Sequence, residues 1–343
     1  MPNFYDLSLD QLRATLAAWG EPAYRAAQVW AAVYRDLAAS PTHISTLPKS
    51  MRSRLAAEFQ FGTLTPAREL KSSDGQTRKV LFQLADGRAI ESVLMGYAQR
   101  RTACISTQAG CAMGCVFCAT GQMGFQRHLS AGEIVEQVIW FARELKAQGD
   151  RLTNIVVMGM GEPFHNYDGT LKAVDILTDP GGFNFGARRI TLSTVGLAPM
   201  IDRFASEKRQ VNLAISLHAA TDDLRAELLP INRRYPLAEV FGAARRYFEQ
   251  THRRVTFEWA LIAGRNDTPE QARAFVKLAH GLDCHVNVIP LNPTPGYGGQ
   301  TSTRERVARF KSILEQHGIP CTVRVRRGID VEAGCGQLAV QTT

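Results

Sequence analysis

Apolar side chains recur with a helical period in the first 65 residues. In the first segment they stand three or four positions apart, at Leu9, Leu12, Leu16 and Trp19. Ser8 and Gln11 form a capping box at the start of this segment, and Gly20 can end it. Two further amphipathic segments are expected over residues 22 to about 37 and from Pro48 onward. We therefore predict a small N-terminal helical domain over residues 1–65, an accessory domain with no catalytic constellation of its own.

The pattern changes to that of strands between Arg78 and Met95. Two strand-like runs, KVLFQL and RAIESVLM, flank the turn residues Asp86 and Gly87. This arrangement predicts a β-hairpin that extends the core over residues 66–98.

Strand-like and helical runs alternate in the remainder of the chain, residues 99–343. The strand-like runs cover residues 102–107, 154–158, 189–194, 211–216, 255–262, 285–291 and 321–325. Helical runs lie near residues 169–178, 236–250, 268–280 and 303–317, and another begins at a Ser130/Glu133 capping box. Such βα repeats predict an α/β fold with a parallel sheet, either doubly wound or closed toward a barrel. Active sites of both types lie at the carboxyl ends of the strands.

Composition is that of an ordinary globular protein. The chain has 343 residues, of which 45% are apolar, enough for one domain of ~250 residues and a smaller one beside it. The first twenty residues lack a basic n-region and a continuous apolar core, so we expect no signal peptide. No run of ~18 apolar residues predicts a membrane span. The odd count of seven cysteines favours a reducing compartment, and we expect a cytoplasmic protein.

The balance of charges favours a polyanionic partner such as nucleic acid. Forty lysines and arginines against thirty-two acidic residues give a net charge of +8 and a pI near 9.3. Arginine pairs are spread along the chain, at 188–189, 233–234, 245–246, 253–254 and 326–327. A nucleic-acid surface must therefore be assembled by folding.

Three cysteines at Cx3Cx2C spacing carry the strongest chemical signal. Cys111, Cys115 and Cys118 can bind three irons of one [4Fe–4S] cluster and leave the fourth iron open. An open iron can bind the amino and carboxylate groups of S-adenosylmethionine, which points to radical chemistry. The alternative is a structural zinc held by these cysteines and His128. No second CxxC or HxxxH pair follows at the spacing of a zinc finger.

Polar motifs follow several of the predicted strands. In the sequence GMGEP, Gly161 lets the backbone approach a ligand closely and Glu162 offers a carboxylate to an ammonium group. The other candidates for binding S-adenosylmethionine are Ser193, Ser216, Leu217, His218 and Asn292. Because parallel strands place their carboxyl ends on one rim, we expect these residues to lie close to the cluster.

The motifs together resemble the RlmN/Cfr family of radical S-adenosylmethionine RNA methyltransferases. The resemblance rests on CISTQAGC, the cluster loop with CATGQMGF, GMGEP, TLSTVG, AISLHA, LLPINRRYP, IPLNPTPG and GIDVEAGCGQL. It implies a partial (β/α)6 barrel with an N-terminal helical domain. It further implies methylation of an adenine carbon in 23S ribosomal RNA, near the peptidyl-transferase centre and before ribosome assembly is complete. For the RlmN branch it adds the adenosine 3′ of the anticodon in transfer RNA.

The same resemblance implies a covalent carrier mechanism. Cys335 would take a methyl group from one S-adenosylmethionine, and a second molecule, cleaved with an electron from a donor such as flavodoxin, would convert that group to a radical that adds to the base. Cys104 would resolve the protein–RNA adduct by closing a transient disulfide with Cys335, and Glu91 would accept the proton from the base. Cys284 and Cys321 match no functional position and are interpreted as core residues.

Pro163 and Glu258 favour the RlmN branch, and hence methylation at C2 of adenine. Methylation at C8, as in the Cfr branch, is the alternative. Hypotheses of other classes are a non-catalytic iron–sulfur RNA-binding protein, which would not need Cys104 and Cys335, and an enzyme that activates a glycyl radical, which would not need the positive charge.

Overall fold

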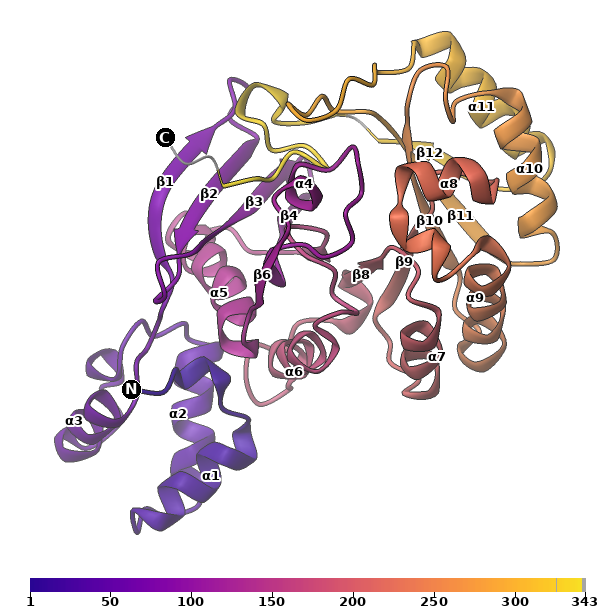
Figure 1. The fold of residues 1–343 in the computed structure, drawn as a ribbon. Coiled ribbons are helices and arrows are strands. Elements are labelled where there is room, and N and C mark those ends of the chain that lie inside the picture. The colour runs from indigo at the N-terminus through magenta and orange to yellow at the C-terminus, as the bar shows by residue number, and fades with distance from the viewer. Residues whose placement is uncertain (325, 341–343) are drawn as a thin grey trace.

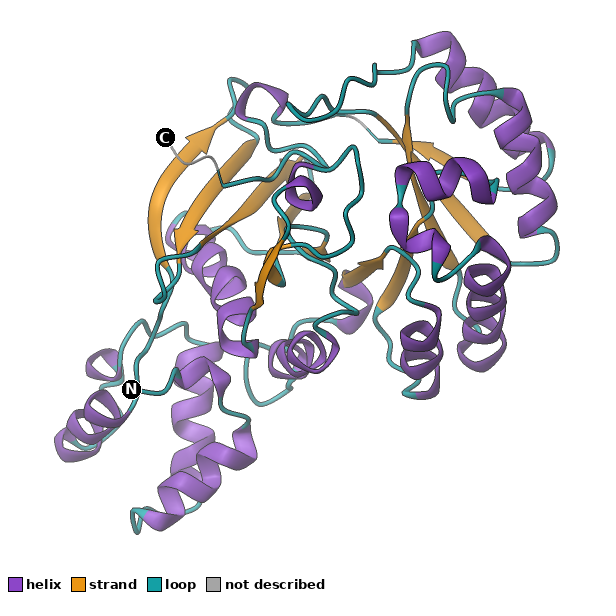
Figure 2. Cartoon of the chain, viewed as in Figure 1, coloured by secondary structure: helices purple, strands orange, loops and turns teal. Residues whose placement is uncertain are grey.

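The computed structural model describes residues 1–324 and 326–340. Figures 1 and 2 show helices at the N-terminus, a layer of antiparallel strands, and a curved sheet with helices on its outer side. The N-terminal helices are α1 (Leu9–Ala18), α2 (Tyr24–Tyr34) and α3 (Lys49–Glu58). The predicted capping box of the first helix is present, since Ser8 Oγ accepts the Gln11 amide and Gln11 Oε1 accepts the Ser8 amide.

Ten strands form one sheet within the described residues. They are β1 (Thr65–Lys71), β2 (Thr77–Gln83), β3 (Ala89–Tyr97), β4 (Arg100–Cys104), β7 (Asn154–Val157), β8 (Ile190–Thr194), β9 (Asn212–Ser216), β10 (Val255–Leu261), β11 (Cys284–Pro290) and β12 (Cys321–Val323). They lie side by side in this order. Neighbours from β1 to β4 are antiparallel, and neighbours from β4 to β12 are parallel.

Helices follow the parallel strands and cover their outer side. They are α5 (Ala131–Ala147), α6 (Tyr167–Thr178), α7 (Ala198–Ser206), α9 (Leu237–Thr251), α10 (Pro269–Ala279) and α11 (Arg304–Gln316). The loops hold the short helices α4 (Ala119–Gln122) and α8 (Asp222–Leu228) and the small sheet of β5 (Gln108–Gly110) and β6 (Phe125–His128). This is the partial (β/α)6 barrel that the resemblance implied. Its parallel strands bring their carboxyl ends to one rim.

The helix α5 shows how the sequence pattern produces this packing. Its predicted capping box is confirmed, with Ser130 Oγ on the Glu133 amide and Glu133 Oε2 on the Ser130 amide. Its apolar side chains, including Ile134 and Val138, are fully buried. Burial of such a side chain contributes about 1.5–3 kcal/mol, so the amphipathic face holds this helix against the sheet.

Some elements were not predicted. The strand β1 carries mostly exposed side chains, so no alternation of buried and exposed positions marks it. The helices α7 and α8 have nine and seven residues, too short for a clear helical period. The last strand ends at Val323, and Val325 of the predicted run 321–325 lies outside the described residues. Within the described parts of the chain, no helix combines the length and apolar composition that a membrane-spanning segment requires.

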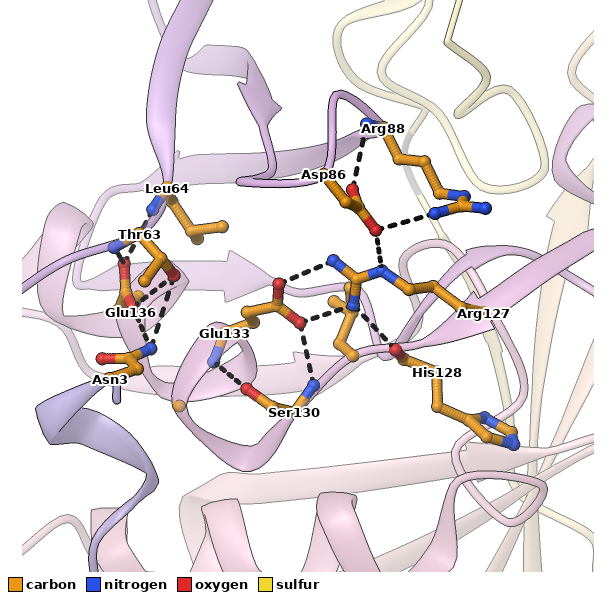
Figure 3. A network of polar contacts seen from close by, with 12 residues as sticks. Asn3, Thr63, Leu64, Asp86, Arg88, Arg127, His128, Ser130, Glu133 and Glu136 are labelled. Carbon is orange, nitrogen blue, oxygen red and sulfur yellow. Dashed lines mark hydrogen bonds and ion pairs between the residues drawn. The ribbon is translucent and has the colours of Figure 1, made fainter. Parts of the chain in front are cut away.

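A buried carboxylate joins the N-terminal helices to the core (Figure 3). Glu136 on α5 accepts the backbone amides of Thr63 and Leu64 at 2.6 and 2.9 Å. It also accepts the Thr63 hydroxyl at 2.9 Å and Asn3 Nδ2 at 2.6 Å. A single side chain therefore satisfies donors from both ends of the N-terminal domain.

We expect Glu136→Ala to loosen this junction. The change leaves the Thr63 and Leu64 amides without their acceptor, at a cost of about 2–4 kcal/mol. Hydrogen exchange at these two amides should accelerate and the urea midpoint should fall. Glu58→Ala, an exposed glutamate on α3, is the matched control and should change neither. Equal effects of the two substitutions would contradict the assigned role.

Candidate active site

The predicted cofactor residues meet at the carboxyl ends of the parallel strands. One cavity, here called the cysteine cavity, is lined by Cys111, Cys115, Cys118, Gly161, Glu162, Ser193, Ser216, His218, Asn292 and Cys335, among others. Leu217 is the one predicted cofactor-binding residue that does not line it. Its side chain is fully buried in the core. Residues from six separate motifs thus form one site.

Glu162 is held rigidly in this cavity. Its carboxylate accepts the amides of Val195 at 2.8 Å and Phe164 at 3.0 Å. Burial raises the pKa of Glu162 to about 7, and the two amides offset part of that shift. A bound ammonium group would favour the ionised form, which fits the predicted contact with an amino acid. The preceding Gly161 has φ +104°, and a Cβ there would lie 2.6 Å from Cβ of Gln108. Glycine is therefore required at this position.

The other strand-end groups are polar and neutral. His218 Nδ1 accepts the Ala260 amide at 2.9 Å, so the proton of the neutral ring lies on Nε2. Burial, followed by the charge of Arg225, lowers the pKa of His218 to about 3. Ser193 and Ser216 lie with their hydroxyls 3.2 Å apart on the same wall. These groups can position a ligand without adding charge.

A fully buried arginine stands behind the cysteines. Arg225 donates to the carbonyls of Leu217 at 3.1 Å and Val195 at 2.6 Å, and to Asn232 Oδ1 at 2.7 Å. It forms no ion pair with any described residue. Burial lowers the pKa of Arg225 to about 10, and Cys115 and then Asp222 act in the opposite direction. A buried cation without a direct ion pair is costly, so its position near Cys115 favours an anion there.

The buried Arg225 beside the three cysteines is consistent with an iron–sulfur cluster at this place. Burial raises the pKa of all three thiols, to about 12 for Cys111, so as free thiols they stay protonated. Bound to iron they would be thiolates, and Arg225 would balance part of their charge. Within the described residues, no three histidine, cysteine or acidic side chains converge on a single-ion site. In a [4Fe–4S] cluster each thiolate binds its own iron, so a shared cavity is the arrangement required.

His128, the fourth ligand in the zinc alternative, lies elsewhere. Its Nδ1 is 3.0 Å from Gln108 Nε2, which is equally close to His165 Nδ1. The two imidazole rings contact each other edge to face, with centroids 4.9 Å apart. The ring is exposed and does not line the cysteine cavity.

A second cavity, here called the polar cavity, lies inside the barrel beside the first. It contains Cys104, and its wall includes Cys335, Asn292 and Arg324, which also line the cysteine cavity. Burial and then the nearby Cys335 raise the pKa of Cys104 to about 12. The Cys335 side chain is open to the cavities, yet the surrounding protein still raises its pKa, while Arg324 acts to lower it. All seven cysteines, each in the described part of the chain, are free thiols.

The segment that carries Cys335 is anchored on the antiparallel strands. Lys79 on β2 forms a buried ion pair with Glu91 on β3 at 3.0 Å. Lys79 also donates to the Glu332 carbonyl at 3.2 Å, and Glu91 accepts the Ala339 amide at 3.0 Å. Burial raises the pKa of Glu91, and Lys79 counteracts part of the shift. Glu91 thus lies beneath the C-terminal segment, and it does not line either cavity.

Sequence reasoning did not identify several cavity residues. Glu258, considered only as a marker of branch, lines the cysteine cavity and accepts Asn287 Nδ2 at 2.9 Å. The other carboxylate oxygen of Glu258, Oε2, lies 3.6 Å from Nη1 of Arg324. The sequence did carry one signal for these residues, an alternation of polar and apolar positions. On β10 and β11, fully buried apolar residues alternate with Thr256, Glu258 and Asn287. In a barrel, such positions face the interior.

Comparisons with known proteins agree with this geometry. The family model of the radical SAM superfamily matches residues 105–279, and that of the ribosomal RNA large subunit methyltransferase N-terminal domain matches residues 2–60. The chain is 52% identical to a probable dual-specificity RNA methyltransferase RlmN of Chloroflexus aurantiacus, over 98% of this chain and 92% of the relative. Dual-specificity RNA methyltransferase RlmN 1 of Myxococcus xanthus is also 52% identical, over 98% and 94% of the two chains.

A crystal structure of a radical SAM methyltransferase from Sphaerobacter thermophilus has the same fold throughout. It shares 53% sequence identity, covers 98% of this chain and 99% of its own, and superposes with a TM-score of 0.96. From its motifs, its site and these relatives, the chain belongs to the RlmN family of radical SAM RNA methyltransferases.

Proposed function

We propose that this enzyme makes 2-methyladenosine in 23S ribosomal RNA and in transfer RNA, at the adenosine 3′ of the anticodon. The dual specificity named for the relatives supports both substrates. The observation that carries the proposal is the position of Cys335, which lines both the cysteine cavity and the polar cavity. A group attached to this sulfur can be received on one side and delivered on the other.

The [4Fe–4S] cluster and two molecules of S-adenosylmethionine per turnover, with an electron from a donor such as flavodoxin, supply the methyl group and the radical that activates it. The chain's own part begins with Cys335. Its thiolate forms a sulfur–carbon bond to the methyl group as the methyl–sulfonium bond breaks. Arg324 favours the thiolate that this step requires. Glu162, with Ser193, Ser216 and His218 around it, orients the methyl donor.

Cys104 and Glu91 act at release. Once the carbon on Cys335 has joined the base, the Cys104 thiolate attacks the Cys335 sulfur, and the sulfur–carbon bond breaks as the disulfide forms. The methylene carbon keeps the electron pair of the broken bond and takes up a proton to become the methyl group, and the proton on the base carbon goes to Glu91. The unpaired electron left by the radical addition would return to the cluster. The disulfide is then reduced by an external dithiol. Cys104 and Cys335 line one cavity, which supports this pairing. Burial makes Glu91 a stronger base, but its carboxylate must first leave the Ala339 amide.

The methylated carbon distinguishes the two branches of the family. Cells that lack this protein should lack 2-methyladenosine in both RNAs, and the complementing gene should restore it, as measured by mass spectrometry of digested ribosomal and transfer RNA. Complementation with Cys335→Ala is the matched control. 8-Methyladenosine as the main product would place the enzyme in the Cfr branch, and an unchanged set of nucleosides would refute the function.

The cluster assignment is tested by iron content. Anaerobically reconstituted protein should bind about four irons and cleave S-adenosylmethionine on reduction. Substitution of Cys111, Cys115 or Cys118 by alanine should abolish both iron binding and cleavage of S-adenosylmethionine, because each thiolate holds its own iron. Cys284→Ala, a buried cysteine on β11 outside both cavities, is the control and should keep both. Stoichiometric zinc in place of iron would overturn the assignment.

The alanine variants of Cys335 and Cys104 should lose activity at different steps of the reaction. Cys335→Ala should abolish methylation of the protein and form no RNA adduct. Cys104→Ala keeps the steps up to addition to the base, so protein should accumulate joined to RNA through Cys335. Denaturing gels of protein from cells, with and without ribonuclease, show the adduct. The carrier mechanism is wrong if both variants are equally free of RNA or if either keeps full activity.

A further inference from the structure

Polar side chains line the interior of this barrel next to Cys335. Each of the seven parallel strands contributes a threonine or an asparagine to the polar cavity or to the cavity next to it: Thr102, Asn154, Thr191, Asn212, Thr256, Asn287 and Thr322. Closed (β/α)8 barrels fill this space with branched apolar side chains. A ring of short side chains that donate and accept hydrogen bonds indicates a chamber for a polar ligand.

Two neutral side-chain oxygens on the lining of this chamber have no hydrogen-bond partner among the described residues. They are Thr102 Oγ1 and Asn292 Oδ1, on side chains that are 5% and 4% exposed. Leaving such a group unsatisfied costs about 1–3 kcal/mol. Asn292 donates its amide nitrogen to the Cys335 carbonyl at 3.1 Å, so its free oxygen lies next to the carrier. A planar ligand with donors and acceptors on its edge, such as a nucleobase, would satisfy both atoms.

Arginines surround this chamber at its open edges. Arg100 at the start of β4, and Arg326 and Arg327 after β12, line the polar cavity. Arg253 and Arg254, just before β10, line the adjoining cavity. That cavity shares Met158, Thr191, Asn287 and Arg324 with the polar cavity, so the two are continuous.

Three of these cations are free to bind an anion. Arg100, Arg254 and Arg326 are exposed and form no ion pair with any residue that the structure describes. Arg100 lies over the Tyr97 ring at 4.2 Å and Arg327 over the same ring at 4.5 Å, and Arg327 also pairs with Asp74 at 3.7 Å, so this part of the rim is ordered. The carboxylates on the lining of the two cavities are Asp283 and Glu258.

We propose that RNA approaches the barrel at these arginines, opposite the cysteines, and inserts its target base into the polar chamber. Arg100, Arg254 and Arg326 hold phosphates on either side of the inserted nucleotide, and Thr102 and Asn292 meet the edge of the base. The base then faces Cys335 from one side while the methyl donor faces it from the other. This proposal rests on the proposed function and adds to it the side of entry and the residues that hold the RNA.

The test is RNA binding as a function of salt. Iron-reconstituted protein is titrated with a fluorescent anticodon stem–loop RNA that has adenosine 3′ of the anticodon. Arg100→Gln, Arg254→Gln and Arg326→Gln should each weaken binding roughly threefold to tenfold and reduce the slope of log K against log salt by ~0.7–0.9. Arg309→Gln, which removes an exposed arginine on the outer helix α11, is the control and should leave the slope unchanged.

A second variant examines the chamber itself. Thr102→Val removes an unsatisfied hydroxyl at nearly constant volume, so the melting temperature should stay the same or rise while methylation of saturating RNA slows. Unchanged binding in all three single arginine variants, or an equal loss in Arg309→Gln, would refute the entrance even if methylation is normal. Normal binding at these arginines without any methylated adenosine would refute the proposed function and leave the entrance intact.

Discussion

The buried ion pair between Lys79 and Glu91 is the constraint on which the site depends. The sheet does not close, and the segment after β12 crosses from the far end of the parallel strands to β2 and β3 (Figure 1). The two side chains of the pair reach this segment on both sides of Cys335, at Glu332 and Ala339. Removing either partner would leave a buried charge without compensation, which typically costs 3–5 kcal/mol. The pair therefore fixes the position of the Cys335 sulfur.

The same pair explains why the predicted base lies away from the chemistry. Glu91 points to the same face of the sheet as Cys104, because Glu91 and Val93 are two residues apart on β3 and Val93 pairs directly with Cys104. Its carboxylate is covered by the segment that it anchors. Proton transfer to Glu91 and retention of the segment thus compete for one group. A proton accepted by Glu91 would weaken its attraction to Lys79 and so loosen the carrier segment at the step when product leaves.

The parts of the site that could be predicted are those that short, contiguous sequence motifs encode. The three cysteines lie within eight residues. Ser193 and Ser216 lie at the carboxyl ends of strands and Glu162 and His218 just after strands, so the shared rim of a parallel sheet places them together. Arg225 could not be found in this way. Its importance lies in being buried near Cys115 without a direct ion pair to any described residue, and that depends on contacts across the fold. The contact between Lys79 and the C-terminal segment spans 253 positions and has no local signal either.

If Cys335 carries the methyl group as proposed, the electrostatics around its sulfur favour the direction of that transfer. The sulfur would pass through a thiolate in a wall where the surrounding protein disfavours charge. Arg324 provides the nearby cation, and Glu258, itself held by Asn287, keeps that cation in the interior. The methylated sulfur would be a neutral thioether, which the surrounding protein does not penalise. The same surroundings that make the thiolate hard to form would therefore stabilise a methylated Cys335 relative to the thiolate.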